Sequence, residues 1–124
     1  MPRILVAEDE KDIRELIAFT LRFAGFDVLL ATNGAEAVEV AEAERPDLVI
    51  LDVRMPRMSG YEACRRLKEN PHTASLPVVF LSAKGQDSEI QQGLESGAEE
   101  YILKPFAPDE LIQQVRDILN RHTS

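Results

Sequence analysis

The feature that most limits the fold of this chain is a regular alternation of short apolar runs with longer amphipathic segments. Each run is typical of a buried β-strand, and each is followed by a segment whose apolar residues have helical spacing. The runs span residues 3–8, 26–31, 47–52, 77–82 and 100–103. Because they lack a polar face, they are typical of parallel strands that are covered on both sides. The alternation therefore predicts an α/β domain, a three-layer sandwich with a parallel five-stranded sheet in the middle.

Helix signals fill the spaces between the apolar runs. The expected helices span residues 12–24, 35–44, from Ser59 to the polar loop that begins at Glu69, 87–96, and 108 to about 121. Ser59 and Glu62 have the spacing of a capping box, which predicts that the third helix begins there. Pro108 stands at the first position of the last helix, where the missing N–H has no helical partner in any case. The first helix is expected to bury one apolar face, made of Ile13, Leu16, Ile17, Leu21 and Ala24.

Composition and charge argue against several classes of function. The chain has 124 residues and a formal net charge of −8, which disfavours binding of nucleic acid or of an anionic membrane by the chain itself. No apolar run approaches the ~20 residues that a membrane-spanning helix needs. The single cysteine, Cys64, cannot form an internal disulfide and fits a reducing compartment. We therefore expect a cytoplasmic protein.

Charged and polar residues stand where four of the apolar runs end. Glu8 and Asp9 close the first run, Asp52 the third, Ser82 the fourth and Lys104 the fifth. In an open parallel sheet the carboxyl ends of the strands share one edge, and ligands bind there. Three acids, one hydroxyl and one amine at that edge suit a metal-assisted transfer of a phosphoryl group to a carboxylate.

The three acidic residues predict a metal site. Carboxylates this close would raise one another's pKa unless a cation offset their charge. Mg²⁺ meets that need, since it takes one or two carboxylates directly and keeps several waters. We expect Asp9 and Asp52 to be direct ligands, Glu8 to act through water, and the backbone carbonyl of Arg54 to complete the set. The alternative is that Glu8 and Asp9 only cap the first helix.

Asp52 is the expected nucleophile and phosphoacceptor. In-line attack of its carboxylate on phosphorus would form an acyl phosphate. Lys104 would place a positive charge beside one phosphoryl oxygen, and the hydroxyl of Ser82 would donate a hydrogen bond.

In chain order these residues resemble the motifs of bacterial response-regulator receiver domains, the CheY-like phosphoacceptor modules of two-component signalling. The motifs are Glu8-Asp9, Asp52 with Met55-Pro56 and Gly60, Ser82-Ala83, and Lys104-Pro105-Phe106. The resemblance covers essentially the whole chain, so residues 1–124 are expected to form one receiver domain. It implies a flavodoxin-like (βα)5 fold with strand order 2-1-3-4-5.

The resemblance also implies how the site works. It implies dependence on Mg²⁺, with Mn²⁺ as a substitute, and transfer from the phosphohistidine of a histidine kinase or a histidine phosphotransfer protein. The backbone of Ala83 is expected to hold the phosphoryl group together with Ser82 and Lys104, and a cis bond before Pro105 to aim the lysine. Ser82 and Tyr101 are the expected switch residues. Their movement on phosphorylation would alter the face made by the fourth helix, the fifth strand and the fifth helix.

The expected partners are proteins, namely the phosphoryl donor and a downstream protein or fused effector domain. No direct contact of this chain with nucleic acid or membrane is expected. The chain is expected to be a monomer or a phosphorylation-dependent dimer. It is not expected to be an enzyme that turns over a separate substrate, because it would catalyse only its own phosphorylation and dephosphorylation at Asp52.

Three other functions compete with this interpretation. A phosphatase of the haloacid-dehalogenase type also uses a strand-end aspartate, but it needs a second aspartate two positions on, where this chain has Arg54. A phosphorylation-independent interaction module would tend to have lost Asp52, Lys104 or the acidic pair. FMN binding, which the fold class alone suggests, would need a Gly-rich phosphate loop after the first strand.

Overall fold

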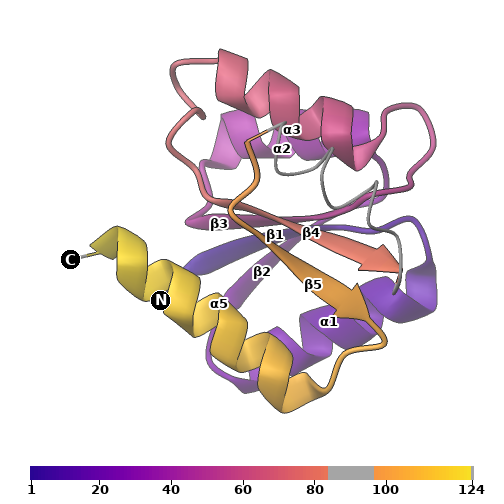
Figure 1. The fold of residues 1–124 in the computed structure, drawn as a ribbon, viewed down its shortest axis with the longest axis vertical. Coiled ribbons are helices and arrows are strands. Elements are labelled where there is room, and N and C mark those ends of the chain that lie inside the picture. Colours follow the sequence, from indigo (N-terminus) through magenta and orange to yellow (C-terminus); the bar gives the residue numbers. More distant parts are fainter. Residues whose placement is uncertain (84–96, 124) are drawn as a thin grey trace.

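The computed structural model describes residues 1–83 and 97–123, in which helices cover both faces of a sheet (Figure 1). The elements are β1 (Arg3–Ala7), α1 (Lys11–Phe23), β2 (Asp27–Ala31), α2 (Gly34–Glu44), β3 (Leu48–Asp52), α3 (Gly60–Glu69), β4 (Val78–Ala83), β5 (Glu100–Lys104) and α5 (Pro108–Thr123). The sheet has five strands in the order β2-β1-β3-β4-β5, and neighbouring strands pair in parallel. The α/β class and the flavodoxin-like strand order are therefore confirmed. The helix expected at 87–96 lies outside the described residues.

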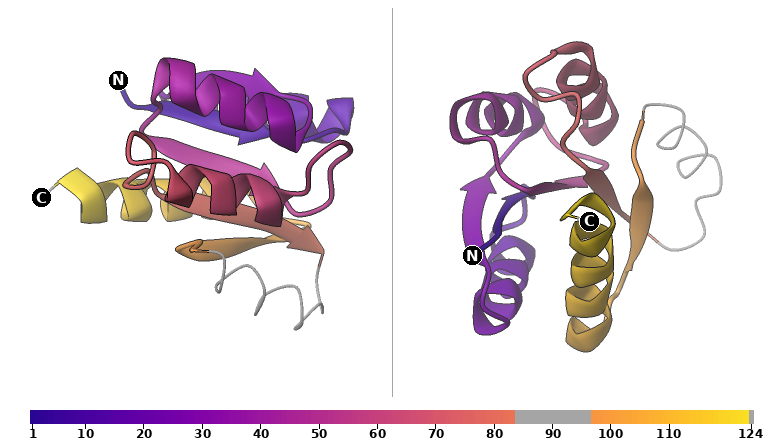
Figure 2. Two further views of the ribbon diagram at one scale, coloured as in Figure 1. Left: turned by 90° about the horizontal axis from the view of Figure 1, so that it is seen from above. Right: turned by 90° about the vertical axis from the view of Figure 1, so that its left-hand side faces the viewer.

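The sheet separates two apolar cores. Successive side chains of a strand point to opposite faces, so Leu5 and Ala7 of β1 join the core under α2 and α3. Ile4 and Val6 join the core under α1 and α5. Figure 2 shows these helix pairs on the two sides of the sheet. Burial on both faces explains why the strands read as continuous apolar runs.

Side-chain caps define where two of the helices begin. The hydroxyl of Ser59 accepts a hydrogen bond from the backbone N–H of Glu62 at 3.2 Å, which confirms the expected start of α3. The side-chain oxygen of Asn33 accepts from the N–H of Glu36 at 2.8 Å, at the start of α2. Each cap satisfies one of the N–H groups that a helix N-terminus leaves without a partner. None of the described helices combines the length and the apolar character that crossing a bilayer would need.

The expected apolar face of α1 is wrong at one position. Ile17 and Leu21 are buried, but Leu16 is 51% exposed. At 3.6 residues per turn, Leu16 lies about 100° around the helix from Ile17, and this angle carries it out of the core. Phe19 and Phe23 are also on the outer side of α1 and exposed to solvent.

Candidate functional site

Strand register brings the expected site residues to one edge of the sheet. Ala7 of β1 pairs with Leu51 of β3, so the residues that follow them, Glu8 and Asp52, lie side by side. A hollow of about 300 Å³ opens at this edge. Its lining residues are Glu8, Asp9, Glu10, Asp52, Val53, Arg54, Leu81, Ser82 and Lys104.

Three carboxylates meet in this hollow. Glu8, Asp9 and Asp52 each offer an oxygen atom, and these atoms all lie within 4.8 Å of one another. Glu8 and Asp52 are buried, whereas Asp9 is exposed. Such a set of hard oxygen donors is what a divalent cation of the Mg²⁺ or Ca²⁺ type prefers. The cluster could therefore hold a metal ion.

Lys104 lies between the two buried carboxylates. Its Nζ is 3.0 Å from Oδ1 of Asp52 and 3.3 Å from Oε2 of Glu8. The lysine ends β5, where it pairs in register with Ala83 at the end of β4. One ammonium group cannot balance two buried carboxylates and an exposed one, so the site keeps a surplus of negative charge.

The charges and the burial of the site shift the pKa values of its groups. Burial, together with the charge of Asp52, raises the pKa of Glu8 from 4.5 to about 7, although Lys104 opposes this. Burial also raises the pKa of Asp52, again against the effect of Lys104. Burial alone would lower the pKa of Lys104, but its hydrogen bonds and ion pairs with the two carboxylates outweigh burial and raise it. The lysine therefore stays a cation, and the raised pKa of Glu8 brings its change of charge close to neutral pH.

Arg14 supports the acidic loop, and reasoning from the sequence missed it. Its Nη1 donates to the backbone carbonyl of Glu8 at 2.9 Å and to that of Asp9 at 3.3 Å. The guanidinium thus holds the backbone of both acidic residues from the first turns of α1. The sequence did contain a signal for Arg14, because a basic residue near a helix N-terminus is unusual where acidic residues are favoured.

Gly60 has no room for a side chain beneath Asp52. A Cβ atom added at Gly60 would overlap the backbone carbonyl oxygen of Asp52. The N–H of Gly60 donates to the carbonyl of Val53 at 3.0 Å, which closes the loop after β3. Glycine at this position therefore lets α3 begin directly against the end of β3.

Ser82, Arg54 and Pro105 lie around the same hollow or beside it. Ser82 is buried and lines the hollow, and exposed Arg54 lines it from the loop after β3. The peptide bond between Lys104 and Pro105 is cis. The roles expected for these residues and for the backbone of Ala83 toward a metal or a phosphoryl group stay predictions.

Tyr101 is not among the residues that line the hollow. It is half-buried in β5, and its ring lies 5.6 Å from that of Phe80 in β4, centre to centre. The ring of Phe80 also contacts that of Tyr61 in α3, with the ring centres 5.2 Å apart in an edge-to-face arrangement. An aromatic row, made of Tyr61, Phe80 and Tyr101, thus runs from α3 across β4 to β5.

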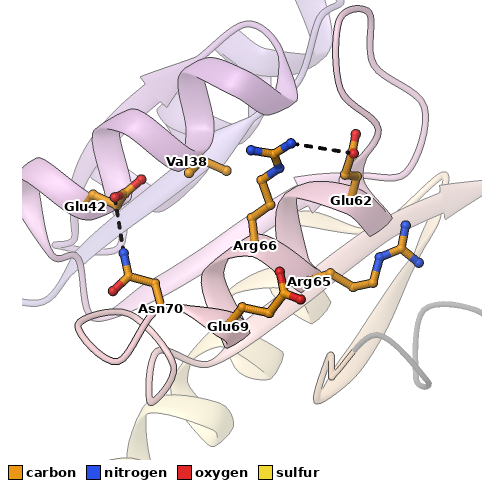
Figure 3. A pocket seen from close by; sticks show the side chains of 7 residues that line it. All are labelled: Val38, Glu42, Glu62, Arg65, Arg66, Glu69 and Asn70. Atoms are coloured by element: carbon orange, nitrogen blue, oxygen red, sulfur yellow. Dashed lines mark hydrogen bonds and ion pairs between the residues drawn. The ribbon is translucent and has the colours of Figure 1, made fainter.

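A second hollow, of about 450 Å³, lies between α2 and α3 (Figure 3). Polar groups that line it contact one another. Arg66 Nη2 is 3.9 Å from Glu62 Oε1, and Asn70 Nδ2 donates to Glu42 Oε2 at 3.1 Å. Ion pairs of this exposed kind contribute little energy, and none of the carboxylates at the strand ends reaches this hollow. It is therefore separate from the candidate site.

Comparison with known proteins decides the family. A model of the response regulator receiver domain matches residues 4–116 of the chain. The chain belongs to the response regulator receiver domain family. The resemblance that the motifs suggested is thereby confirmed, and the acidic hollow at the carboxyl edge of the sheet lies within the matched part of the receiver.

Two relatives of this receiver are transcriptional regulators. It is 40% identical to the DNA-binding dual master transcriptional regulator RpaA of Synechocystis. The alignment has 121 residues and covers 98% of this chain and 50% of RpaA. The receiver is 44% identical to the phosphate regulon transcriptional regulatory protein PhoB of Pseudomonas aeruginosa. This alignment has 118 residues and covers 95% of this chain and 52% of PhoB. The chain thus spans about half the length of these relatives.

Solved structures agree with the family. The receiver matches the chemotaxis response regulator CheY4 of Vibrio cholerae with a TM-score of 0.90 and 30% identity, over 95% of this chain and 98% of that one. It matches the receiver domain of the Francisella response regulator 1452 with a TM-score of 0.90 and 32% identity, over 99% of this chain and 100% of that one. The likeness covers nearly the whole receiver.

The expectation about partners is wrong, because it left nucleic acid out. RpaA is named a DNA-binding regulator, and PhoB a transcriptional regulatory protein. The expectation relied on the charge of −8, which describes these 124 residues only. Since the two relatives are about twice as long, the charge of the receiver says nothing about the contacts of the rest of such a protein.

Proposed function

We propose that Asp52 accepts a phosphoryl group from the phosphohistidine of a histidine kinase, and that residues 1–124 act as one receiver domain that relays this signal. The observation that carries the proposal is the contact of buried Asp52 with Lys104, at 3.0 Å, beside two further carboxylates. A nucleophilic carboxylate needs a cation close by to offset the charge that arrives with a phosphoryl group. The lysine supplies such a charge from within the lining of the hollow.

The chemistry of the transfer follows from this arrangement. A carboxylate oxygen of Asp52 attacks phosphorus in line, the O–P bond forms as the N–P bond of the phosphohistidine breaks, and the electron pair leaves with the imidazole nitrogen. Lys104 then moves its ammonium group from Asp52 to a phosphoryl oxygen. The hydroxyl of Ser82 and the backbone N–H of Ala83 donate to other oxygens. Water later hydrolyses the acyl phosphate, so the chain acts on its own phosphoryl group and on no separate substrate.

The acidic cluster fits a magnesium ion, with Mn²⁺ as a substitute. Bound Mg²⁺ would neutralise negative charge on the transferring group. In this proposal Asp9 and Asp52 bind the metal directly, Glu8 acts through water, and the backbone carbonyl of Arg54 completes the set. The surplus negative charge that Lys104 leaves in the hollow supports the assignment.

Ser82 and Tyr101 are proposed to carry the signal away from Asp52. A phosphoryl group on Asp52 would draw the Ser82 hydroxyl toward it, since the serine lines the same hollow. Tyr101 would then turn inward from its half-buried position against Phe80. The face of β5 and α5 changes shape as a result.

The output is proposed to be a DNA-binding effector. This proposal rests on the names of relatives such as RpaA. We also propose that the protein acts in the cytoplasm, where it would have access to DNA. A chimera that joins residues 1–124 to the remaining half of RpaA tests it. Phosphorylation should raise the affinity of the chimera for DNA, and an unchanged affinity would remove the support for this output.

Intact mass spectrometry after incubation with acetyl phosphate tests the phosphoacceptor. The wild-type chain should gain one phosphoryl group in the presence of Mg²⁺ and none in EDTA, and Asp52→Asn should gain none. Asp27→Asn is the matched control, since Asp27 is an exposed aspartate at the start of β2. Labelling that persists in Asp52→Asn contradicts the proposal, and steady release of phosphate without an adduct points to a phosphatase instead.

A further inference from the structure

The outer side of α1 carries an exposed apolar patch. We define the α1 patch as Leu16, Phe19 and Phe23 of α1 with Leu30 of β2, which are 51%, 69%, 84% and 36% exposed. The rings of Phe19 and Phe23 stack with their centres 6.5 Å apart. Single exposed apolar residues are ordinary, but a contiguous group with two aromatic rings marks a contact surface.

A hollow adjoins these rings. It has a volume of about 560 Å³ and lies between α1 and the edge strand β2. The lining residues are Glu15, Ala18, Phe19, Arg22, Phe23 and Leu30. The side chain of Ala18 is buried but lines this hollow, beside the large exposed ring of Phe19. A projection and a depression therefore lie side by side on this helix.

The charges that border the patch are complementary to each other. Glu15 and Arg22 are seven residues apart, which is close to two helical turns, so both lie on the same side of α1 as Phe19. Arg22 donates to the carbonyl of Val28 at 3.5 Å, but a guanidinium has five N–H donors and can serve a second acceptor. One negative and one positive group thus flank the apolar centre.

We propose that the α1 patch binds a second copy of this chain, with the two α1 helices antiparallel about a twofold axis. An axis midway between Ala18 and Phe19 places Ala18 opposite Phe19 of the second copy. The same axis places Glu15 opposite Arg22 of the second copy. A single arrangement therefore matches small with large and acid with base, which is the self-complementarity that a twofold interface requires. The contact needs neither a metal ion nor a phosphoryl group, and it does not rest on the proposed function.

Sedimentation equilibrium over a concentration series tests the proposal, in EDTA and at about 0.15 M salt, where exposed charges more than about 8 Å apart are largely screened. The salt matters because each copy carries a net charge of −8. The wild-type chain should dimerise, and Phe19→Ser should weaken dimerisation at least tenfold. Leu103→Ser is the matched control, because Leu103 is an exposed leucine on β5, at the other end of the sheet from β2, and it should leave the dimer constant unchanged.

A charge exchange tests the register of the two helices. Glu15→Arg and Arg22→Glu should each weaken dimerisation about tenfold, because each places like charges opposite one another, and the double variant should restore the wild-type constant. A wild-type chain that stays monomeric at all concentrations overturns the proposal and leaves a different protein as the occupant of the patch. A dimer that Phe19→Ser does not weaken, or a double variant that fails to restore it, also overturns the proposal.

Discussion

Replacing Glu8 by glutamine should stabilise the metal-free chain above neutral pH. Glu8 is buried, with Asp52 beside it, and its pKa rises from 4.5 to about 7 on folding. Between these two values the folded chain holds a proton that the unfolded chain has released. Stability from this group is therefore fully present below pH 4.5 and is lost as the pH rises to about 7. Glu8→Gln keeps the neutral form at every pH and should escape this loss.

The size of the effect follows from the two pKa values. Their difference is about 2.5 pH units, and each unit corresponds to about 1.4 kcal/mol. Glu8→Gln should thus exceed the wild type by up to about 3 kcal/mol in free energy of unfolding at about pH 8, and by almost nothing at about pH 4. The coupling of Glu8 to Asp52 and Lys104 makes this an upper bound.

Urea unfolding in EDTA at several pH values measures the effect. The wild-type curve should decline between about pH 5 and about pH 7, and the curve of Glu8→Gln should be flatter over that window. Glu39→Gln, at an exposed position of α2, is the control and should follow the wild type. If the wild type and Glu8→Gln show the same dependence on pH, Glu8 does not carry the buried charge and the reasoning is refuted.

Three further changes test the supports of the site and of the fold. Gly60→Ala should destabilise the chain by about 1–3 kcal/mol in urea unfolding, because the new Cβ displaces the end of β3. It should also slow the labelling of Asp52 by acetyl phosphate, and a normal labelling rate would contradict this. Arg14→Gln should weaken Mg²⁺ binding about tenfold in calorimetry, a factor equivalent to about 1.4 kcal/mol, and its circular dichroism spectrum should match that of the wild type. Equal Mg²⁺ affinity would show that Arg14 does not position the acidic loop. Asn33→Ala should cost about 1 kcal/mol of stability through the lost helix cap, and Asn33→Ser should cost little.

Local signals in the sequence predicted the elements of the fold well. Each expected strand lies within one residue of the observed strand at each end, because continuous apolar runs bounded by polar residues leave little choice. The start of α3 was predictable from Ser59 and Glu62, since a cap depends only on neighbouring residues. The strand order came from the resemblance to a family, because alternation alone does not determine which strands become neighbours.

The sequence predicted which residues meet at the site better than it predicted the contacts that they make with one another. Strand ends brought Glu8, Asp52 and Lys104 to one edge, as expected. The contacts of the Lys104 ammonium group with both buried carboxylates were not predicted, and its contact with a phosphoryl oxygen stays a prediction. Arg14 was missed because its partners are backbone carbonyls, which no side-chain pattern reveals. Leu16 was misplaced because the angular limit of a buried helix face depends on the neighbouring elements.

The aromatic row has a consequence for spectroscopy. The chain contains two tyrosines and no tryptophan, and both tyrosine rings lie against Phe80. Tyrosine fluorescence therefore originates from one small region between α3 and β5, and no tryptophan emission masks it. Fluorotyrosine incorporated in place of tyrosine would give two resonances, each from a ring that contacts Phe80. The native chain thus carries its own optical reporters beside Phe80 of β4, and fluorotyrosine would add a magnetic signal at the same two positions.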